Sequence, residues 1–237
     1  MLFTDGPLST IDHLAEYEVE VRQVGAAEGI NLDAKLLLAQ VEMGLELQAS
    51  YPDLILEQVV VTPPLRLWHI FHTLAIVYRD AFNRRRNDKY QPKWTEYQEL
   101  AKTAAGQYRS IGIGIALSPL AAPAVPALAG VAGGSLPAAI YVVHATWVNS
   151  GGQESAPSPA VSISLPDNQL LQVTPPVAPP LALGWYPYVG EQRQVTDAIA
   201  PGTGWTMPAG GPVIGPTLPV GQAPTYYRPQ PHILQRG

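Results

Sequence analysis

His69 and His72 are the residue pair of this sequence best spaced for metal chemistry. They lie three positions apart in a segment expected to be helical, so both imidazoles could reach one ion. No third ligand of a matching type follows one turn away, and the pattern is not the His-Glu-x-x-His of zinc enzymes. Because Trp68, Ile70 and Phe71 surround them, we expect packed or interfacial histidines, with neither metal nor cofactor.

Other residue types that carry catalysis are present without the spacing that catalysis needs. Gly112 and Gly114 suggest a nucleotide loop, but they follow a predicted helix, and neither a third glycine nor a lysine comes after them. Carboxylates are frequent before residue 60, yet no spacing singles out an acid and base pair. The chain has no cysteine, which excludes thiolate metal sites and cysteine nucleophiles. The sequence therefore predicts a protein that is not an enzyme.

Charge is distributed in two blocks of opposite sign. Residues 1–64 carry 2 basic and 11 acidic side chains, a net charge of −9, whereas residues 65–109 carry 9 basic and 4 acidic ones, a net charge of +5. Such a domain can pack head to tail, the acidic face of one copy against the basic face of the next, and contacts of this kind close into rings. Alternatively, the helices compensate one another within one chain. The sequence leaves both interpretations open.

A basic cluster lies near residue 85. Arg84, Arg85 and Arg86 could touch nucleic acid, but arginines at a helix end also suit the helix dipole, and Asp80 and Asp88 dilute the patch. Sequence-specific DNA binding is not predicted, whereas loose contact with DNA that passes through a ring fits the pattern. The residues expected to make subunit or DNA-conduit contacts are Arg79, Arg84, Arg85, Arg86, Lys89 and Lys93.

The elements that would position these side chains begin with two predicted helices. The first follows Ser9 or Thr10 as N-cap and runs to about Gly25, although YEVEVRQV also fits a strand. Asn31 can cap the second, which ends before Pro52. Its predicted buried stripe consists of Leu32, Leu36, Ala39, Met43 and Leu47.

Proline marks the start of two further helices. Pro63 and Pro64 suit the first turn of a third helix, and Pro92 marks the fourth. Apolar residues follow both starts at spacings of three and four, which gives each helix one buried face. Four helices with short connections indicate a small bundle.

Composition changes abruptly after residue 109. The first 109 residues hold 26 of the 33 charged side chains, whereas the other 128 hold 7 of them and 20 of the 25 prolines. The uncharged run from Ser110 to Gln153 is rich in Ala, Gly and Pro, which favours an extended linker over a membrane span. The N-terminus lacks the basic and apolar parts of a signal peptide, so we expect synthesis and use in a cytoplasm.

Short strands separated by Gly and Pro are predicted beyond the linker. Val161, Ile163 and Leu165 alternate with serines, which is typical of a strand with one buried face. Further strands are expected around 140–148, 169–174, 183–189 and 192–199, at the spacing of a β-sandwich. The three tryptophans of this half could stack on a sugar, but sandwich tryptophans are more often core: Trp147, Trp185 and Trp205. The tail from Gly215 has no periodicity.

Two parts of the chain resemble known virion proteins. Within residues 10–115, the stretch VVVTPPLRLWHIFHTLAIVYRDAFNRRRNDKYQPKWTEY resembles the helical part of tailed-phage head-to-tail adaptor, or head-completion, proteins. Within residues 136–215, YVVHATWVNSGGQESAPS, LGWYPYVGEQ and GTGWTMPAGG resemble the fibronectin type III or immunoglobulin-like modules of many virion proteins. The first resemblance implies a ring, usually dodecameric, that is stacked on the portal and forms part of the DNA conduit. It also implies a C-terminal arm that engages a neighbour or the portal, here through Tyr226, Tyr227, Arg228, Ile233 and Leu234.

Together these patterns predict an α+β protein of two domains. We expect a helical adaptor domain over 1–115, a Pro/Ala/Gly-rich linker over 116–135, a fibronectin III/Ig-like β-sandwich over 136–215 and an extended arm over 216–237. The expected function is that of a structural protein in the neck of a phage virion, made in the host cytoplasm. Its expected partners are its own copies, the portal, tail, nozzle or fibre proteins and, non-specifically, packaged DNA, but no membrane. The alternative is a fibre or head-decoration protein with a carbohydrate- or receptor-binding module.

Overall fold

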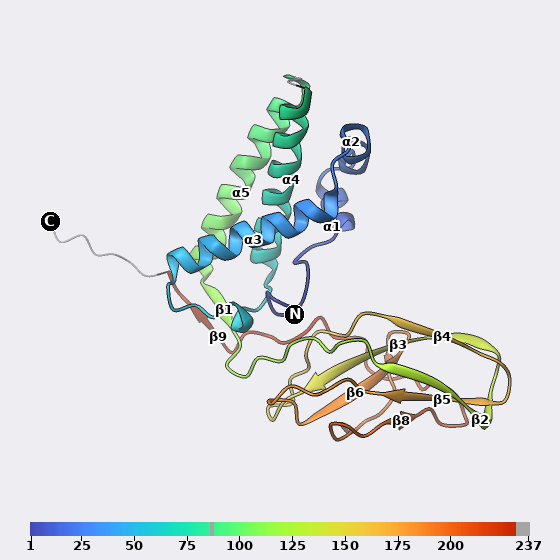
Figure 1. Ribbon diagram of the computed structural model, residues 1–237. Helices are drawn as coiled ribbons and strands as arrows, with labels where there is room; N and C mark the ends of the chain where they lie inside the picture. The colour runs from blue at the N-terminus through green and yellow to red at the C-terminus, as the bar shows by residue number, and fades with distance from the viewer. Residues whose placement is uncertain (86–87, 231–237) are drawn as a thin grey trace. The chain divides into compact units, whose positions relative to one another are not determined.

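The structure, a computed structural model, describes residues 1–85 and 88–230, and of Arg85 only the backbone (Figure 1). Five α-helices come first, and antiparallel strands make up the later part of the chain, so the predicted α+β class is confirmed. The chain forms two compact units. The helical unit contains Gly6–Ile115 and the segment from Pro224 onward, and the β unit contains Met1–Asp5 and Ala116–Ala223. The chain therefore passes between the units three times.

Five helices build the helical unit: α1 (Ile11–Tyr17), α2 (Val21–Glu28), α3 (Leu32–Ser50), α4 (Pro63–Arg85) and α5 (Gln91–Ile111). Two short 3₁₀ turns, Leu56–Gln58 and Asp88–Tyr90, precede α4 and α5. The predicted starts are confirmed, because the Asn31 side chain caps α3 by accepting from the Ala34 amide, α4 begins at Pro63, and Pro92 lies in the first turn of α5. Long α4 and α5 lie side by side, and α3 crosses α4 (Figure 1).

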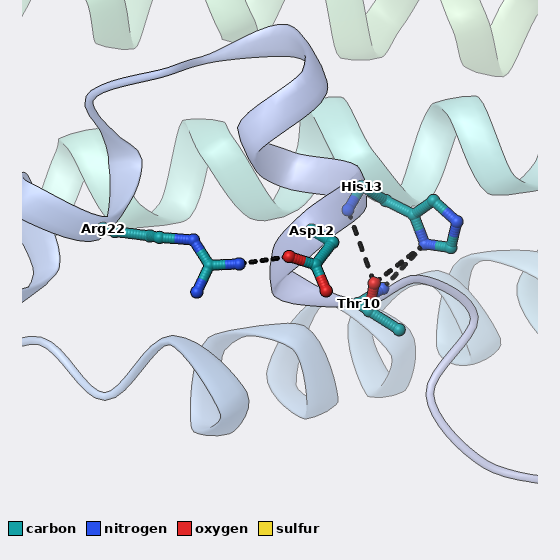
Figure 2. Close-up of polar contacts among 4 residues, drawn as sticks. All are labelled: Thr10, Asp12, His13 and Arg22. Carbon is teal, nitrogen blue, oxygen red and sulfur yellow. Dashed lines mark hydrogen bonds and ion pairs between the residues drawn. The ribbon is translucent and has the colours of Figure 1, made fainter.

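The first predicted helix is in fact two helices. Thr10 caps α1 together with His13: the Thr10 hydroxyl accepts from the His13 amide, and His13 Nδ1 accepts from the Thr10 amide (Figure 2). The helix stops at Glu18, whose backbone is extended and whose carboxylate turns inward to Tyr97. An ion pair between Arg22 and Asp12 then ties α2 back to α1 (Figure 2). The helix ends where the carboxylate of Glu18 reaches its hydrogen-bond donor. The spacing of apolar residues in the sequence does not reveal such a contact.

A short antiparallel pair closes the helical unit. Strand β1 (Ile113–Ile115) follows α5 directly and pairs with β9 (Tyr226–Arg228). Gly112 has a φ of +98°, and a Cβ there would lie 2.9 Å from the carbonyl oxygen of Arg228. Glycine is therefore required where the C-terminal segment approaches α5. Gly112 therefore serves this close approach rather than a nucleotide loop.

The β unit consists of two antiparallel sheets around one apolar core. One sheet has the order β2-β5-β8 and the other β4-β3-β6-β7. Its strands are β2 (Ala127–Leu136), β3 (Ala139–Val148), β4 (Val161–Leu165), β5 (Gln169–Thr174), β6 (Gly184–Val189), β7 (Gln192–Arg193) and β8 (Trp205–Thr206). Residues of both sheets share the core, including Trp147, Leu171, Val173, Trp185 and Trp205.

Three expectations differ from the structure in this half. The predicted linker over 116–135 becomes strand β2 from Ala127, because the ten residues between Pro126 and Pro137 all keep their amides and can pair with β5. The strand expected over 192–199 is limited to β7. The predicted arm over 216–237 is split between the units, since residues up to Ala223 belong to the β unit and β9 belongs to the helical unit.

Candidate assembly surfaces

The two histidines that could have shared a metal make separate contacts. His69 is fully buried, and its Nε2 donates to the Leu36 carbonyl at 2.9 Å. That bond leaves Nδ1 to accept from the Ser9 hydroxyl at 2.7 Å, which fixes the neutral tautomer. Burial lowers the pKa of His69 to about 4. His69 thus joins α4 to α3 and to the segment before α1, as a packed histidine.

His72 belongs to a different contact. Its Nε2 lies 2.7 Å from a carboxylate oxygen of Glu42 on α3. Among the described residues no group of three His, Asp or Glu side chains could hold a metal ion. Both histidines therefore serve the packing of α3 against α4.

A buried carboxylate organises the junction of α1, α2 and α5. Glu18 accepts from the Tyr97 hydroxyl at 2.6 Å and lies 3.0 Å from the Lys93 ammonium. Burial alone would raise the pKa of Glu18, but these two donors outweigh it and hold the pKa below its ordinary value. Glu28 plays a similar part at the end of α2, where it accepts from the Tyr90 hydroxyl at 2.9 Å. Two of the carboxylates before residue 60, Glu18 and Glu28, are therefore internal acceptors.

The basic residues predicted to touch neighbours or DNA have partners within the helical unit. Arg79 lies 3.6 Å from Asp80, Arg84 donates to the Glu28 carbonyl at 2.7 Å, and Lys93 reaches Glu18. The Lys89 ammonium lies 5.6 Å from the ring centre of Tyr90. The side chain of Arg85 and all of Arg86 lie outside the described residues. Of these side chains, Lys93 shows the charge compensation between helices that the sequence left open, and the role of the whole set toward other molecules stays a prediction.

One face of α3 is apolar and exposed. We call Ala34, Leu37, Leu38, Val41 and Leu45 the outer stripe. Leu37, Val41 and Leu45 are 54%, 60% and 63% exposed. The opposite face of the helix carries the predicted buried residues Leu32, Leu36, Ala39, Met43 and Leu47, all of which are buried. Large aliphatic side chains at four-residue spacing in water are typical of a surface that a partner covers.

Charged residues follow one edge of the outer stripe. Lys35, Glu42 and Glu46 lie seven and four positions apart, between the stripe and the buried face of α3. Lys35 lies 2.5 Å from Asp80, Glu42 contacts His72, and Glu46 pairs with Arg109. Each partner comes from α4 or α5. Lys35 and Glu46 are therefore paired with opposite charges inside the unit, whereas Glu42 is hydrogen-bonded to His72.

A cleft of about 290 Å³ lies behind this edge, between α3, α4 and α5. Trp68, Trp94, Arg79 and Arg109 line it, and the Arg109 guanidinium lies 5.6 Å from the ring centre of Trp68. Arg109 pairs with Glu46, and Arg79 shares the carboxylate of Asp80 with Lys35, so the positive charge of these two arginines is compensated in part. The cleft has the character of a packing groove.

The C-terminal residues expected to form an arm lie partly within the helical unit. Tyr226, Tyr227 and Arg228 form β9, and both tyrosines are nearly half exposed. The Arg228 guanidinium lies 2.6 Å from Asp53 and 5.5 Å from the ring centre of Tyr51. Its hydrogen bond to Asp53 holds the pKa of that carboxyl below its usual value. Ile233 and Leu234 lie outside the described residues.

Polar groups of the β unit converge on one carboxylate. Glu154 accepts from the hydroxyls of Thr146 and Tyr188, at 2.9 and 2.7 Å, and from Arg193 at 3.2 Å. Burial, followed by the bond to Glu154, raises the pKa of Tyr188. The tryptophans weighed as sugar-stacking residues are in the core instead, since each of Trp147, Trp185 and Trp205 is at most 8% exposed.

Comparison with known protein families, with curated proteins and with solved structures finds no match to this chain. Among the described residues, no helix combines the length and the apolar character required to cross a bilayer.

Sequence reasoning missed the outer stripe, although a signal for it was present. Leu37, Val41 and Leu45 repeat every four residues, as the predicted buried stripe does, so α3 is apolar on two opposite faces. The role of Glu18 had no comparable signal, because its donor Tyr97 lies 79 positions away.

Proposed function

We propose that this chain is a structural protein of a tailed-phage virion, which forms the head-to-tail adaptor ring between portal and tail and lines part of the DNA conduit. In this proposal the helical unit builds the ring, which we expect to be dodecameric. The β unit, as a fibronectin III/Ig-like sandwich, faces tail, nozzle or fibre proteins. The protein has no catalytic role and resides in the neck of the virion.

The observation that supports an assembly role is the uncovered apolar face of α3. Four large aliphatic side chains of the outer stripe stand in water on a helix whose other face is already buried. A monomer gains nothing from such a surface, whereas an assembly buries it. The titratable residues around it are used for internal contacts: His69 lies between one acceptor and one donor, and His72 and Arg109 contact carboxylates.

Ring symmetry explains how a modest contact could hold the joint. Each subunit in a closed ring touches two neighbours and one or more portal copies, so many weak contacts act together. The residues proposed for subunit or conduit contacts remain Arg79, Arg84, Arg85, Arg86, Lys89 and Lys93. Those for the arm remain Tyr226, Tyr227, Arg228, Ile233 and Leu234.

Immunolabelling of virions tests the location. An antibody raised against the full chain is applied to intact phage particles and viewed by negative-stain electron microscopy. Label confined to the head-tail junction is expected. Label on fibres, tail tip or capsid would instead support the second candidate, a fibre or head-decoration protein.

Charge reversal tests the ring. Changing Arg84, Arg85 and Arg86 together to Glu is expected to abolish ring assembly without changing helical content, measured by electron microscopy and circular dichroism. Lys102→Glu is the matched control, since Lys102 is an exposed residue of α5 paired with Glu99. Rings that form normally in the triple variant would rule out the charge-based contact.

The second candidate has one observation in its favour. The β unit carries a shallow apolar depression lined by Ile140, Val142, Val189, Val213 and Ile214, of which Ile140 and Ile214 are 71% and 98% exposed. A receptor with an apolar surface could bind there, whereas the buried tryptophans offer no face to a sugar. Binding of the full chain to host cells, lost in Ile214→Asp, would favour this candidate over the adaptor.

A further inference from the structure

We infer that the outer stripe of α3 is a contact surface for a second copy of this chain, in which two α3 helices pair antiparallel about a two-fold axis at Val41. This inference uses the same face of α3 that supports the assembly role, but it concerns a pair of copies and is tested without the ring. A two-fold contact is complete with two copies, whereas a ring needs a head-to-tail contact. The pair would therefore exist with or without a virion.

Helix α3 carries large apolar side chains on two opposite faces. Its inner face packs against α4 through Leu36, Met43 and Leu47, which are at most 2% exposed. Its outer face carries Leu37, Val41 and Leu45, which are more than half exposed. A helix with large apolar side chains on two opposite faces buries the second face only when a partner covers it.

The outer stripe is symmetric in sequence about Val41. Leu37 and Leu45 lie four positions on either side of Val41. Rotation by half a turn about an axis at Val41 therefore brings Leu37 against Leu45 of the second copy, and Leu45 against Leu37. A contact made by the same patch on both copies must be self-complementary. The outer stripe meets this condition, because aliphatic side chains then face aliphatic side chains.

The charged residues beside the outer stripe have partners within their own unit. Two copies of a chain with a formal net charge of −5 repel each other unless the charges near the contact are balanced. Beside the stripe, Glu46 pairs with Arg109 and Lys35 with Asp80 of their own unit, and Glu42 is hydrogen-bonded to His72. These carboxylates already have partners in their own unit, so they offer little to a basic partner. An identical copy carries the same charged residues with the same internal partners.

Disulfide cross-linking of the full chain tests the two-fold axis. The chain has no cysteine, so Val41→Cys introduces its single thiol. Packed helices lie about 8–10 Å apart, which brings facing Cα atoms to roughly 3.4–5.4 Å and so overlaps the range of a disulfide. Val19→Cys is the control, because Val19 is an 81% exposed valine of the same unit outside the stripe.

Two outcomes of this cross-linking are distinguishable. Under mild oxidation we expect Val41→Cys to form a disulfide dimer at least about 10-fold faster than Val19→Cys. Equal rates would overturn the inference, because residue 41 would then not face its own copy.

Sedimentation equilibrium supplies a second measurement that needs no oxidation. The wild type is expected to dimerise reversibly, and Val41→Glu to raise the dissociation constant about 100-fold by placing two like charges at the axis. Val19→Glu should leave the constant unchanged. A wild type that stays monomeric would overturn the inference. So would self-association that Val41→Glu weakens while Val41→Cys fails to cross-link, since that combination indicates a head-to-tail contact.

Discussion

The helical unit and the β unit satisfy their buried polar groups in different ways. The helical unit has two buried carboxylates at different places, Glu18 and Glu28, and each accepts from a tyrosine distant in sequence. The β unit directs three side-chain donors to one carboxylate, Glu154, and has a core that contains three tryptophans. The jump in charge content after residue 109 thus separates two kinds of stabilisation. The two units should respond differently to the same disturbance.

Removing one large core side chain from each unit gives the largest expected effects. Trp185→Ala in the β core should cost about 4 kcal/mol, and Leu74→Ala in the helical core about 3 kcal/mol, because both side chains are fully buried. Thermal unfolding followed at 222 nm reports the helices, and near-ultraviolet circular dichroism weights the tryptophans of the β unit. Each variant should shift mainly the transition of its own unit. Equal shifts in both would show one cooperative structure.

Acid should weaken the helical unit through His69. The pKa of His69 is lowered by burial to about 4, so the unfolded chain, with an ordinary histidine pKa near 6.5, binds the proton first. Stability is therefore complete above about pH 6.5 and falls as the pH drops toward 4. Between pH 7 and 5 the loss should be about 2 kcal/mol by urea unfolding. His69→Gln should show a flatter profile over this range, and an unchanged slope would contradict the assignment.

Deleting β9 should destabilise the helical unit although the segment is remote in sequence. Removal of Pro224–Gly237 uncovers β1 and Tyr51 and breaks the Arg228–Asp53 pair, at a cost of about 1–2 kcal/mol. Removal of residues 231–237 alone is the control. The helical transition should drop while the β transition stays. A shift confined to the β unit would refute the assignment of this segment to the helices.

Two single hydroxyl deletions give the smallest expected effects and compare the carboxylate sites directly. Tyr97→Phe removes one of two side-chain donors to Glu18, whereas Tyr188→Phe leaves Thr146 and Arg193 on Glu154. We expect a loss of about 1–2 kcal/mol for Tyr97→Phe and less than about 1 kcal/mol for Tyr188→Phe by urea unfolding. Equal losses would mean that spreading or concentrating donors makes no difference.

Local signals in the sequence predicted the helix starts well. Asn31, Pro63 and Pro92 mark the beginnings of α3, α4 and α5, because capping and proline geometry act within one turn. Partners far apart in sequence were not predictable in the same way. The amino group of Met1 donates to the carbonyl of Val220, and β9 pairs with β1, and no local pattern announces either contact.

The candidate surfaces were predictable only in part. The two blocks of charge are evident from composition, but whether Lys93 meets Glu18 or a neighbour depends on how the helices pack. The buried face of α3 was predicted from its spacing, whereas the outer stripe was overlooked because one apolar face is enough to explain a surface helix. The outer stripe indicates a contact surface only because the opposite face of α3 is already buried.

The exchange of terminal segments between the units has a consequence for synthesis. Met1–Asp5 are made before the rest of the β unit, which ends at Ala223. The helices are complete at Ile111, whereas their closing strand β9 begins only at Tyr226. Since chains are made at about 5–20 residues per second, the helical unit waits on the order of ten seconds or more for its final strand. Neither unit can be finished before residue 223 has been made, so both reach their final form almost together.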